Sequence, residues 1–290
     1  MKFSQLSLLL SFLVMLGFRT ENLSAQSGGE LLFKGEIGIA PYTFRKVMKF
    51  GVPATLDIIK SMGFSSIEGG GAGMDAEEYK RLCDDRGLKI PSMGTGYQNL
   101  VDDPMSVVKI AKTYGSKYVM VAWIPHNTGN FGLANAIKAC ADFNAAGKVL
   151  AENGITLCYH AHGYEFKKQD DGTTLLDYMM ANTKPEYVSF EMDIFWIHFG
   201  GGDPVDLLKK YQGRWKLMHV KDMKKDIKKD LTGLTDPEHD VALGTGQLDI
   251  KAILKTAAET GIEHYFIEDE SSRIFDQLPE SIKYLKETKL

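Results

Sequence analysis

The sequence predicts a single-domain (β/α)₈ barrel that follows a short export signal. Eight β-prone runs alternate with segments of helical period, and glycines close many of the helical segments. The 290 residues, 44% hydrophobic and 25% charged, match the size and composition of one globular barrel. We therefore assign residues 26–290 to the barrel and residues 1–25 to the signal.

The eight runs expected to be strands are short, and each precedes a segment of helical period. They are Glu36–Ala40, Ser65–Glu68, Lys89–Met93, Tyr118–Ala122, Ile155–His160, Tyr187–Asp193, Lys216–Val220 and Tyr265–Glu268. Eight parallel strands are the number that closes such a barrel.

The helices between these strands have local sequence signals. One apolar stripe comprises Leu133, Ile137, Cys140, Phe143, Gly147 and Leu150, and another comprises Ile250, Ile253, Leu254 and Ala257. Asp203-Pro204 begins a helix, because Asp caps free N–H groups and Pro suits the first turn. Pro279 is expected to open the last helix. The glycines expected to end helices are Gly63, Gly87, Gly115, Gly154 and Gly261.

The N-terminus has the pattern of a secretory signal peptide. Lys2 precedes the apolar run Leu6–Phe18, which is too short to span a bilayer, and Leu23-Ser24-Ala25 offers a small residue for cleavage. A buried helix or an uncleaved anchor is the plainer alternative. We expect cleavage after Ala25 and export, to the periplasm of a Gram-negative bacterium, with no stable membrane association afterwards.

Charge and cysteine content exclude some functions. The chain has a formal net charge of −4, and an acidic protein binds polyanions poorly, so nucleic acid is not expected as a partner. The three cysteines cannot all pair within one chain, and Cys140 and Cys158 are expected to be buried thiols.

Polar side chains gather where the predicted strands end, which is where barrels of this kind place their catalytic groups. Carboxylates and imidazoles converge there from four consecutive strands, the fifth to the eighth. Such carboxylates would repel one another without a cation, and mixed O and N ligands suit Mn, Co, Zn, Fe or Mg. We therefore expect one divalent metal ion.

Each residue also has a plainer role when it is taken alone. Asp193 could cap a helix, His219 could be a core histidine, and Glu268 could be a solvated strand end. Their joint position at strand ends favours the metal site. The long segment Lys221–Thr245 is expected to lie over that site.

These segments resemble the xylose-isomerase-like TIM barrels, the sugar phosphate isomerase/epimerase group, over nearly all of the chain after the signal. The most specific pieces are residues 159–166, Asp193 through Asp203-Pro204, Gly213-Arg214, His219-Val220-Lys221-Asp222-Met223, Gly244-Thr245-Gly246-Gln247-Leu248-Asp249, and residues 265–271. The resemblance implies a metal bound by Glu, Asp, His and a second Glu on strands five to eight. Asp193, His219 and Glu268 match the last three.

The fifth strand departs from this pattern. His160 stands where epimerases of the family carry Glu, and Glu165 follows a few residues later. We expect Glu165 to be the ligand ahead of His160, because a carboxylate keeps the usual set. The candidate proton-transfer residues are Glu268, Lys221 and His162, and the candidate substrate-binding residues are Glu68, Trp123, Trp196, His198 and Arg273.

The resemblance implies a sugar isomerase or epimerase that removes a proton next to a carbonyl through a metal-stabilised enediolate. The alternative is a lyase, dehydratase or hydratase acting on keto-sugars or 3-keto-glycosides by the same enolate chemistry. An apurinic endonuclease is opposed by the acidity and the export signal, and a non-catalytic sugar-binding protein would need no metal. We expect a small carbohydrate as the substrate and a homodimer as one possible assembly.

Overall fold

The computed structural model describes residues 30–71 and 73–289. The predicted signal at residues 1–25 lies outside this range, so its cleavage and the export of the protein stay predictions. Within the described ranges, no helix is long and apolar enough to cross a membrane.

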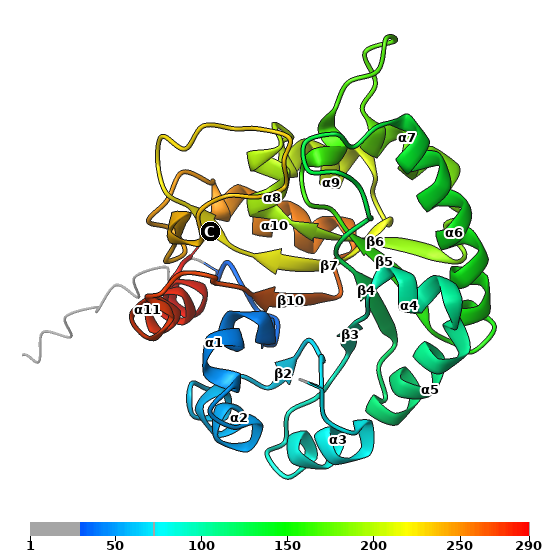
Figure 1. Cartoon of the computed structure of the whole chain (residues 1–290). Helices are drawn as coiled ribbons and strands as arrows, with labels where there is room; N and C mark the ends of the chain where they lie inside the picture. The colour runs from blue at the N-terminus through cyan, green and yellow to red at the C-terminus, as the bar shows by residue number, and fades with distance from the viewer. Residues whose placement is uncertain (1–29, 72, 290) are drawn as a thin grey trace, which may run out of the picture.

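Eight parallel strands curl into a nearly closed barrel, and the helices surround it (Figure 1). The strands are β1 (Ile37–Ile39), β2 (Ser66–Ile67), β3 (Ser92–Gly94), β4 (Tyr118–Val121), β5 (Thr156–His160), β6 (Val188–Asp193), β7 (Trp215–Val220) and β10 (His264–Ile267). Their order is β2-β1-β10-β7-β6-β5-β4-β3. The remaining gap is bridged where Gly69 N–H donates to the Ser92 carbonyl at 2.7 Å. The predicted fold class is confirmed, and every predicted strand overlaps an observed one.

The helices cover the outside of this barrel. They are α1 (Arg45–Met48), α2 (Val52–Ser61), α3 (Ala76–Asp84), α4 (Tyr97–Asp102), α5 (Pro104–Tyr114), α6 (Leu133–Ala151), α7 (Leu175–Asn182), α8 (Ile194–Phe199), α9 (Pro204–Lys210), α10 (Ile250–Thr260) and α11 (Ile274–Glu287). Short 3₁₀ helices span Pro41–Phe44, Tyr164–Phe166 and Pro237–His239, and β8 (Asp222–Met223) pairs antiparallel with β9 (Asp240–Val241). Asp203 caps α9 as predicted, and the five predicted helix-ending glycines all have positive φ.

Two sequence expectations about helices were wrong. The last helix begins at Ile274, and Pro279 lies inside it on the exposed side. Buried residues continue at helical spacing from Ile274 to Leu285, so packing outweighs the one hydrogen bond that the proline cannot donate. In α6, Leu133 and Ile137 are exposed, because the buried face runs through alanines such as Ala136 and Ala139.

The barrel interior has an apolar layer below a polar one. Ala40, Tyr118, Cys158, Leu217 and Phe266 form a cluster of their own. Because strand side chains alternate, the next residues on the same face after Cys158, Leu217 and Phe266 are His160, His219 and Glu268. The fold thus places the site directly above a packed apolar floor.

Candidate metal centre and active site

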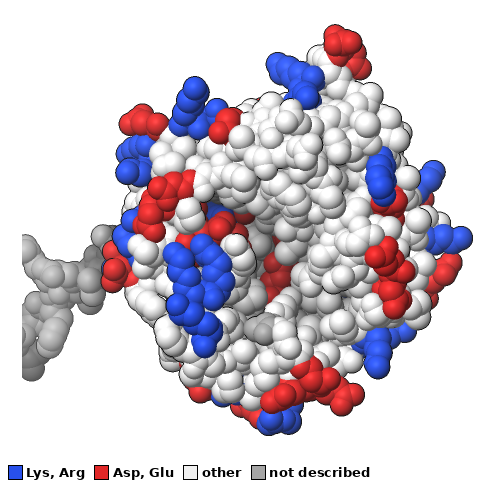
Figure 2. Space-filling view, in the orientation of Figure 1, with Lys and Arg blue, Asp and Glu red and all other residues white. Residues whose placement is uncertain are grey.

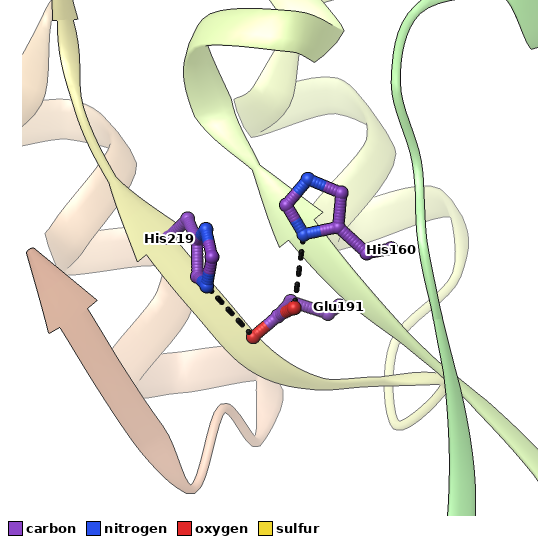
Figure 3. Close-up of side chains that lie close together, drawn as sticks. All are labelled: His160, Glu191 and His219. Atoms are coloured by element: carbon purple, nitrogen blue, oxygen red, sulfur yellow. Dashed lines mark hydrogen bonds and ion pairs between the residues drawn. The ribbon is translucent and has the colours of Figure 1, made fainter. Parts of the chain in front are cut away.

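Five buried ligand-type side chains meet above the apolar floor, and they come from four neighbouring strands. They are His160 on β5, Glu191 and Asp193 on β6, His219 on β7, and Glu268 just after β10. Two overlapping groups have geometry that could hold an ion: His160, Glu191 and His219, and Asp193, His219 and Glu268. Figure 3 shows the first group, in which the Glu191 carboxylate lies between the two imidazole rings.

His219 lies at the centre of this cluster. Its Nε2 is 2.8 Å from a Glu68 oxygen and 3.5 Å from Glu191 Oε1. Its Nδ1 is 3.3 Å from Glu268 Oε2 and 3.8 Å from Asp193 Oδ2. The core-histidine alternative, in which the backbone would hold His219, does not describe this environment, because four carboxylates surround the ring.

Asp193 uses its two carboxylate oxygens differently. Oδ1 accepts hydrogen bonds from the backbone N–H groups of Phe195 and Trp196, both at 2.9 Å, and so caps α8. Oδ2 is 3.8 Å from His160 Nε2 and from Lys221 Nζ, the same distance that separates it from His219 Nδ1. The helix-cap role and the site role therefore belong to the same side chain.

The electrostatics of the cluster favour a cation. Burial and the charge of Glu68 raise the pKa of Glu191 well above its usual range, and burial raises the pKa of Asp193 to about 6. Burial alone would lower the pKa of His219, but Glu191 and Glu268 outweigh it and hold that pKa well above its usual range. Without a metal, protons are needed to balance these buried carboxylates.

The residues also fit a divalent ion by their unmet hydrogen bonds and their spacing. Glu191 Oε1 and Asp193 Oδ2 are buried and, among the described residues, lack a hydrogen-bond partner. Ligand atoms about 2.1 Å from a tetrahedral ion lie roughly 3.4 Å apart, close to the 3.3–3.8 Å separations of His219 Nδ1 from Glu268 and Asp193. A divalent ion beside His219 Nδ1 would therefore satisfy Asp193 Oδ2.

Glu165 does not reach this cluster, so the geometry reverses the order expected from the sequence and brings His160 to the site. The Glu165 carboxylate accepts hydrogen bonds from the Tyr159 hydroxyl and from the His162 backbone N–H. Tyr159 alternates with His160 along β5, so its ring faces the surrounding helices and packs against Phe143 of α6. Glu165 is thus held outside the barrel.

Lys221 is fully buried at the edge of the cluster. Its ammonium lies 2.8 Å from Glu270 Oε1, 3.1 Å from Glu268 Oε2 and 3.7 Å from Asp240 Oδ2. Burial alone would lower the pKa of Lys221, but the carboxylates of Asp240, Glu268 and Glu270 outweigh it and raise that pKa well above its usual range. These carboxylates favour the charged form, which suits Lys221 as a cation that holds Glu268.

An aromatic cavity of about 530 Å³ opens above the cluster, and its lining includes His160, His219 and Glu268. Its aromatic walls are Trp123 and Trp196, with His162 stacked on Trp196 at a ring distance of 4.8 Å. Residues 233–235 and 237 close one side, which confirms that the Lys221–Thr245 segment covers the site. Figure 2 shows this face of the molecule hollowed near its centre, with acidic side chains on the wall of the hollow.

The covering segment is fastened to the barrel by Asp222. Its buried carboxylate accepts hydrogen bonds from the backbone N–H groups of Met223 (2.8 Å), Gly244 (2.9 Å), Gly246 (2.9 Å) and Leu248 (3.2 Å). A Cβ at Gly246 would lie 2.2 Å from Asp222 Oδ1. The Gly244-Thr245-Gly246 motif is thus a cradle for this carboxylate.

Two of the predicted substrate-binding residues lie elsewhere. His198 of α8 does not line the cavity, and the charged groups near it are Lys229 and Asp203. Arg273 binds the Glu238 carboxylate at 2.6 Å and two carbonyls of the covering segment, so it fastens that segment from outside. Glu68, in contrast, lies in the cluster and accepts a hydrogen bond from Ser92 at 2.7 Å.

Four residues at the site had no role assigned to them from the sequence: Glu191, Glu270, Tyr42 and Arg45. Glu191 stands two residues before Asp193 on the same strand, so the strand period could have placed both on one face. Tyr42 and Arg45 follow the end of β1 and line the cavity, and Arg45 donates a 2.8 Å hydrogen bond to the Glu270 carbonyl. The sequence signal that could have identified Tyr42, Arg45 and Glu270 was their position shortly after the end of a strand.

Comparison with known proteins agrees with this architecture. Residues 56–288 match the family described as xylose isomerase-like TIM barrel. The chain belongs to this family. Both the barrel and the resemblance drawn from the sequence are thereby confirmed.

Proteins named for different activities are similar to this chain. The inosose dehydratase of Salmonella typhimurium is 26% identical over 257 residues, covering 76% of this chain and 83% of that enzyme. A sugar phosphate isomerase/epimerase from Parabacteroides distasonis superposes with a TM-score of 0.70 at 25% identity, covering 87% of this chain and 96% of that one. The IolI protein with a bound zinc atom has the same fold, with a TM-score of 0.66 at 14% identity and coverage of 87% and 95%.

Proposed function

We propose that this protein is a divalent-metal-dependent enzyme that removes a proton next to the carbonyl of a small keto-sugar. The observation that carries the proposal is the buried cluster at the floor of a cavity with two tryptophan walls, in which two carboxylate oxygens have no partner among the described residues. His160 through Nε2, Asp193 through Oδ2, His219 through Nδ1 and Glu268 would hold the ion, while Glu191 lies 2.9 Å from the other nitrogen of His160 and would orient that ring. The chemistry that a bound divalent cation supplies is polarisation of a carbonyl and a neighbouring hydroxyl, which makes the adjacent C–H acidic.

Glu268 and His162 are the groups suited to accept that proton. Burial alone would raise the pKa of Glu268, but Lys221 and His219 outweigh it and hold that pKa well below its usual range, so the carboxylate is charged. Burial, with the charge of Lys221, lowers the pKa of His162 to about 4, so its ring is neutral near pH 7. His162 Nδ1 lies 3.2 Å from the Gly233 carbonyl, which can only accept, so Nδ1 carries the hydrogen and Nε2 keeps a lone pair.

The cavity walls suit a sugar ring. Trp123 and Trp196 offer flat apolar surfaces for the C–H faces of a sugar, while the carboxylates at the floor can accept its hydroxyl hydrogens. Loop residues 233–235 close over this space and limit the access of water. A neutral keto-sugar therefore fits both the walls and the floor.

The fate of the sugar after proton removal has two candidates. Return of a proton at another position or face gives an isomer or epimer, as the name of the Parabacteroides distasonis relative suggests. Loss of a β-hydroxyl gives a dehydratase, and the similarity to inosose dehydratase over 83% of that enzyme favours this second outcome. Both outcomes use the same first step.

The test is proton exchange in D₂O, followed by ¹H NMR, with metal-loaded protein and a panel of keto-sugars. We expect the ¹H signal of the carbon next to the carbonyl to disappear as deuterium replaces the proton. The rate of this exchange should decrease at least about 100-fold in Glu268→Gln. It should not change in Glu263→Gln, because Glu263 lies near the opposite end of β10. A product of unchanged mass indicates isomerisation, and loss of water indicates elimination. Full retention of every carbon-bound proton during turnover would contradict the proposal, once a labelled substrate has excluded a 1,2-hydride shift.

A further inference from the structure

A second cavity lies against the same cluster. It has a volume of about 400 Å³ and opens on the side of β1 to β4, away from the tryptophan walls. His219 and Glu268 line both this cavity and the aromatic cavity, and so do Tyr42, Arg45 and Met120. The proposed reacting centre therefore lies where two cavities meet.

The two cavities differ in chemistry. The second one is walled mainly by carbon, from Pro41, Met48 and Met120 and from glycines that follow β2 or end β3. Besides the groups of the metal cluster, Arg45 is the one charged side chain that lines it within the described residues. An apolar group would gain by leaving water for this space, whereas a second sugar would find few hydrogen-bond partners.

Two glycines that line the second cavity have space beside them for a larger side chain. A Cβ built at Gly70 meets no atom within 4 Å among the described residues, and Gly70 does not have the positive φ that would require glycine. A Cβ at Gly94 would make only an ordinary contact, at 3.7 Å, with Met120. A side chain at position 70, which lines the cavity, would thus meet no obstacle among the described residues.

The volume suits a group of more than one ring. An apolar cavity of about 150 Å³ holds one benzene ring. The second cavity, at about 400 Å³, has more than twice that volume. Tyr42 is 56% exposed and lines both cavities, where its ring can stack on a planar group.

We infer that the substrate is a glycoside with an apolar, aromatic aglycone, whose keto-sugar ring binds in the aromatic cavity and whose aglycone binds in the second cavity. This inference rests on the proposed function for the identity of the sugar half. It concerns binding, so it applies whether the sugar ring is isomerised or loses a substituent. It deepens the proposal because a free monosaccharide would occupy only one of the two cavities.

The test compares the affinities of methyl and phenyl β-glucosides for the metal-loaded protein by isothermal titration calorimetry. We expect the phenyl glucoside to bind at least tenfold more tightly to the wild type. In Gly70→Leu this ratio should fall to about one while the affinity for methyl glucoside is unchanged. Gly96→Leu is the matched control: Gly96 follows β3, lines neither cavity and has a negative φ, so the preference should remain.

Equal binding of the two glucosides by the wild type would overturn the inference, as would the absence of binding by either. A phenyl preference that survives Gly70→Leu would also overturn it, because the ring would then lie elsewhere. The readout needs no turnover, so it is separate from the exchange test. Proton exchange without phenyl preference refutes the second cavity alone, and phenyl preference without exchange refutes the proposed reaction alone.

Discussion

Replacement of Asp222 by asparagine tests how firmly the covering segment is fastened over the site. The carboxylate accepts two backbone N–H groups on each oxygen, from Met223 and Leu248 on Oδ1 and from Gly244 and Gly246 on Oδ2. In Asp222→Asn one oxygen becomes an NH₂ group, which faces two donors in either orientation. At least two charge-assisted bonds are lost, at about 1.5–3 kcal/mol each.

A smaller desolvation cost offsets part of this loss. Burial raises the pKa of Asp222 against the effect of its four hydrogen bonds, which shows that the charged form is costly to bury. We therefore expect a net loss of about 2–4 kcal/mol in the free energy of unfolding, or roughly 5–15 °C in the melting temperature.

Thermal unfolding of Asp222→Asn beside Asp249→Asn measures this effect. Asp249 caps α10 through one hydrogen bond to Ala252 N–H at 3.0 Å, and asparagine caps a helix about as well, so the control should lose less than about 0.5 kcal/mol. If the two variants melt at the same temperature, the four-bond cradle does not stabilise the fold as argued here.

Three further predictions follow from the site, the surface and the N-terminus. His160→Ala should remove most of the bound metal while Glu165→Gln keeps it, as measured by elemental analysis; the opposite result would restore the ligand order expected from the sequence. Burial alone would raise the pKa of Asp177, but hydrogen bonds led by the one from Lys210 lower it to about 2. Asp177→Asn should therefore lower the free energy of unfolding by about 1 kcal/mol at pH 7. The difference in melting temperature between this variant and the wild type should shrink as the pH falls from about 4 toward 2. Protein recovered from its native host should begin at Gln26, and N-terminal sequencing that finds Met1 would refute cleavage after Ala25.

The parts of the structure set by local sequence rules were predictable. Glycines with positive φ end helices at predicted positions such as Gly115 and Gly261, and the strand period places Asp193 and His219 on the inner face of neighbouring strands. These rules depend only on residues a few positions apart. They were therefore sufficient for the barrel and for the centre of the candidate site.

The remaining errors concern side chains whose position depends on contacts that local sequence rules do not encode. Whether His160 or Glu165 enters the site depends on the hydroxyl of Tyr159, which captures the Glu165 carboxylate outside the barrel. Trp196 and His198 stand two positions apart on the six-residue helix α8, and only Trp196 lines the cavity. Arg273 fastens the covering segment through Glu238, at a separation of 35 residues, and no local pattern encodes that pairing.

The closure of the barrel by its first and last strands has a consequence for folding. β1 pairs with β10, joining Ile37 to Tyr265, and the contact between Glu68 and His219 spans 151 residues. Contacts of such long range form slowly, because the intervening chain must be ordered first. A chain that ends before β10 lacks Glu268 and leaves β1 and β7 as open edges, which invite aggregation. Assembly of the metal centre is therefore expected to be among the last events of folding rather than its nucleus.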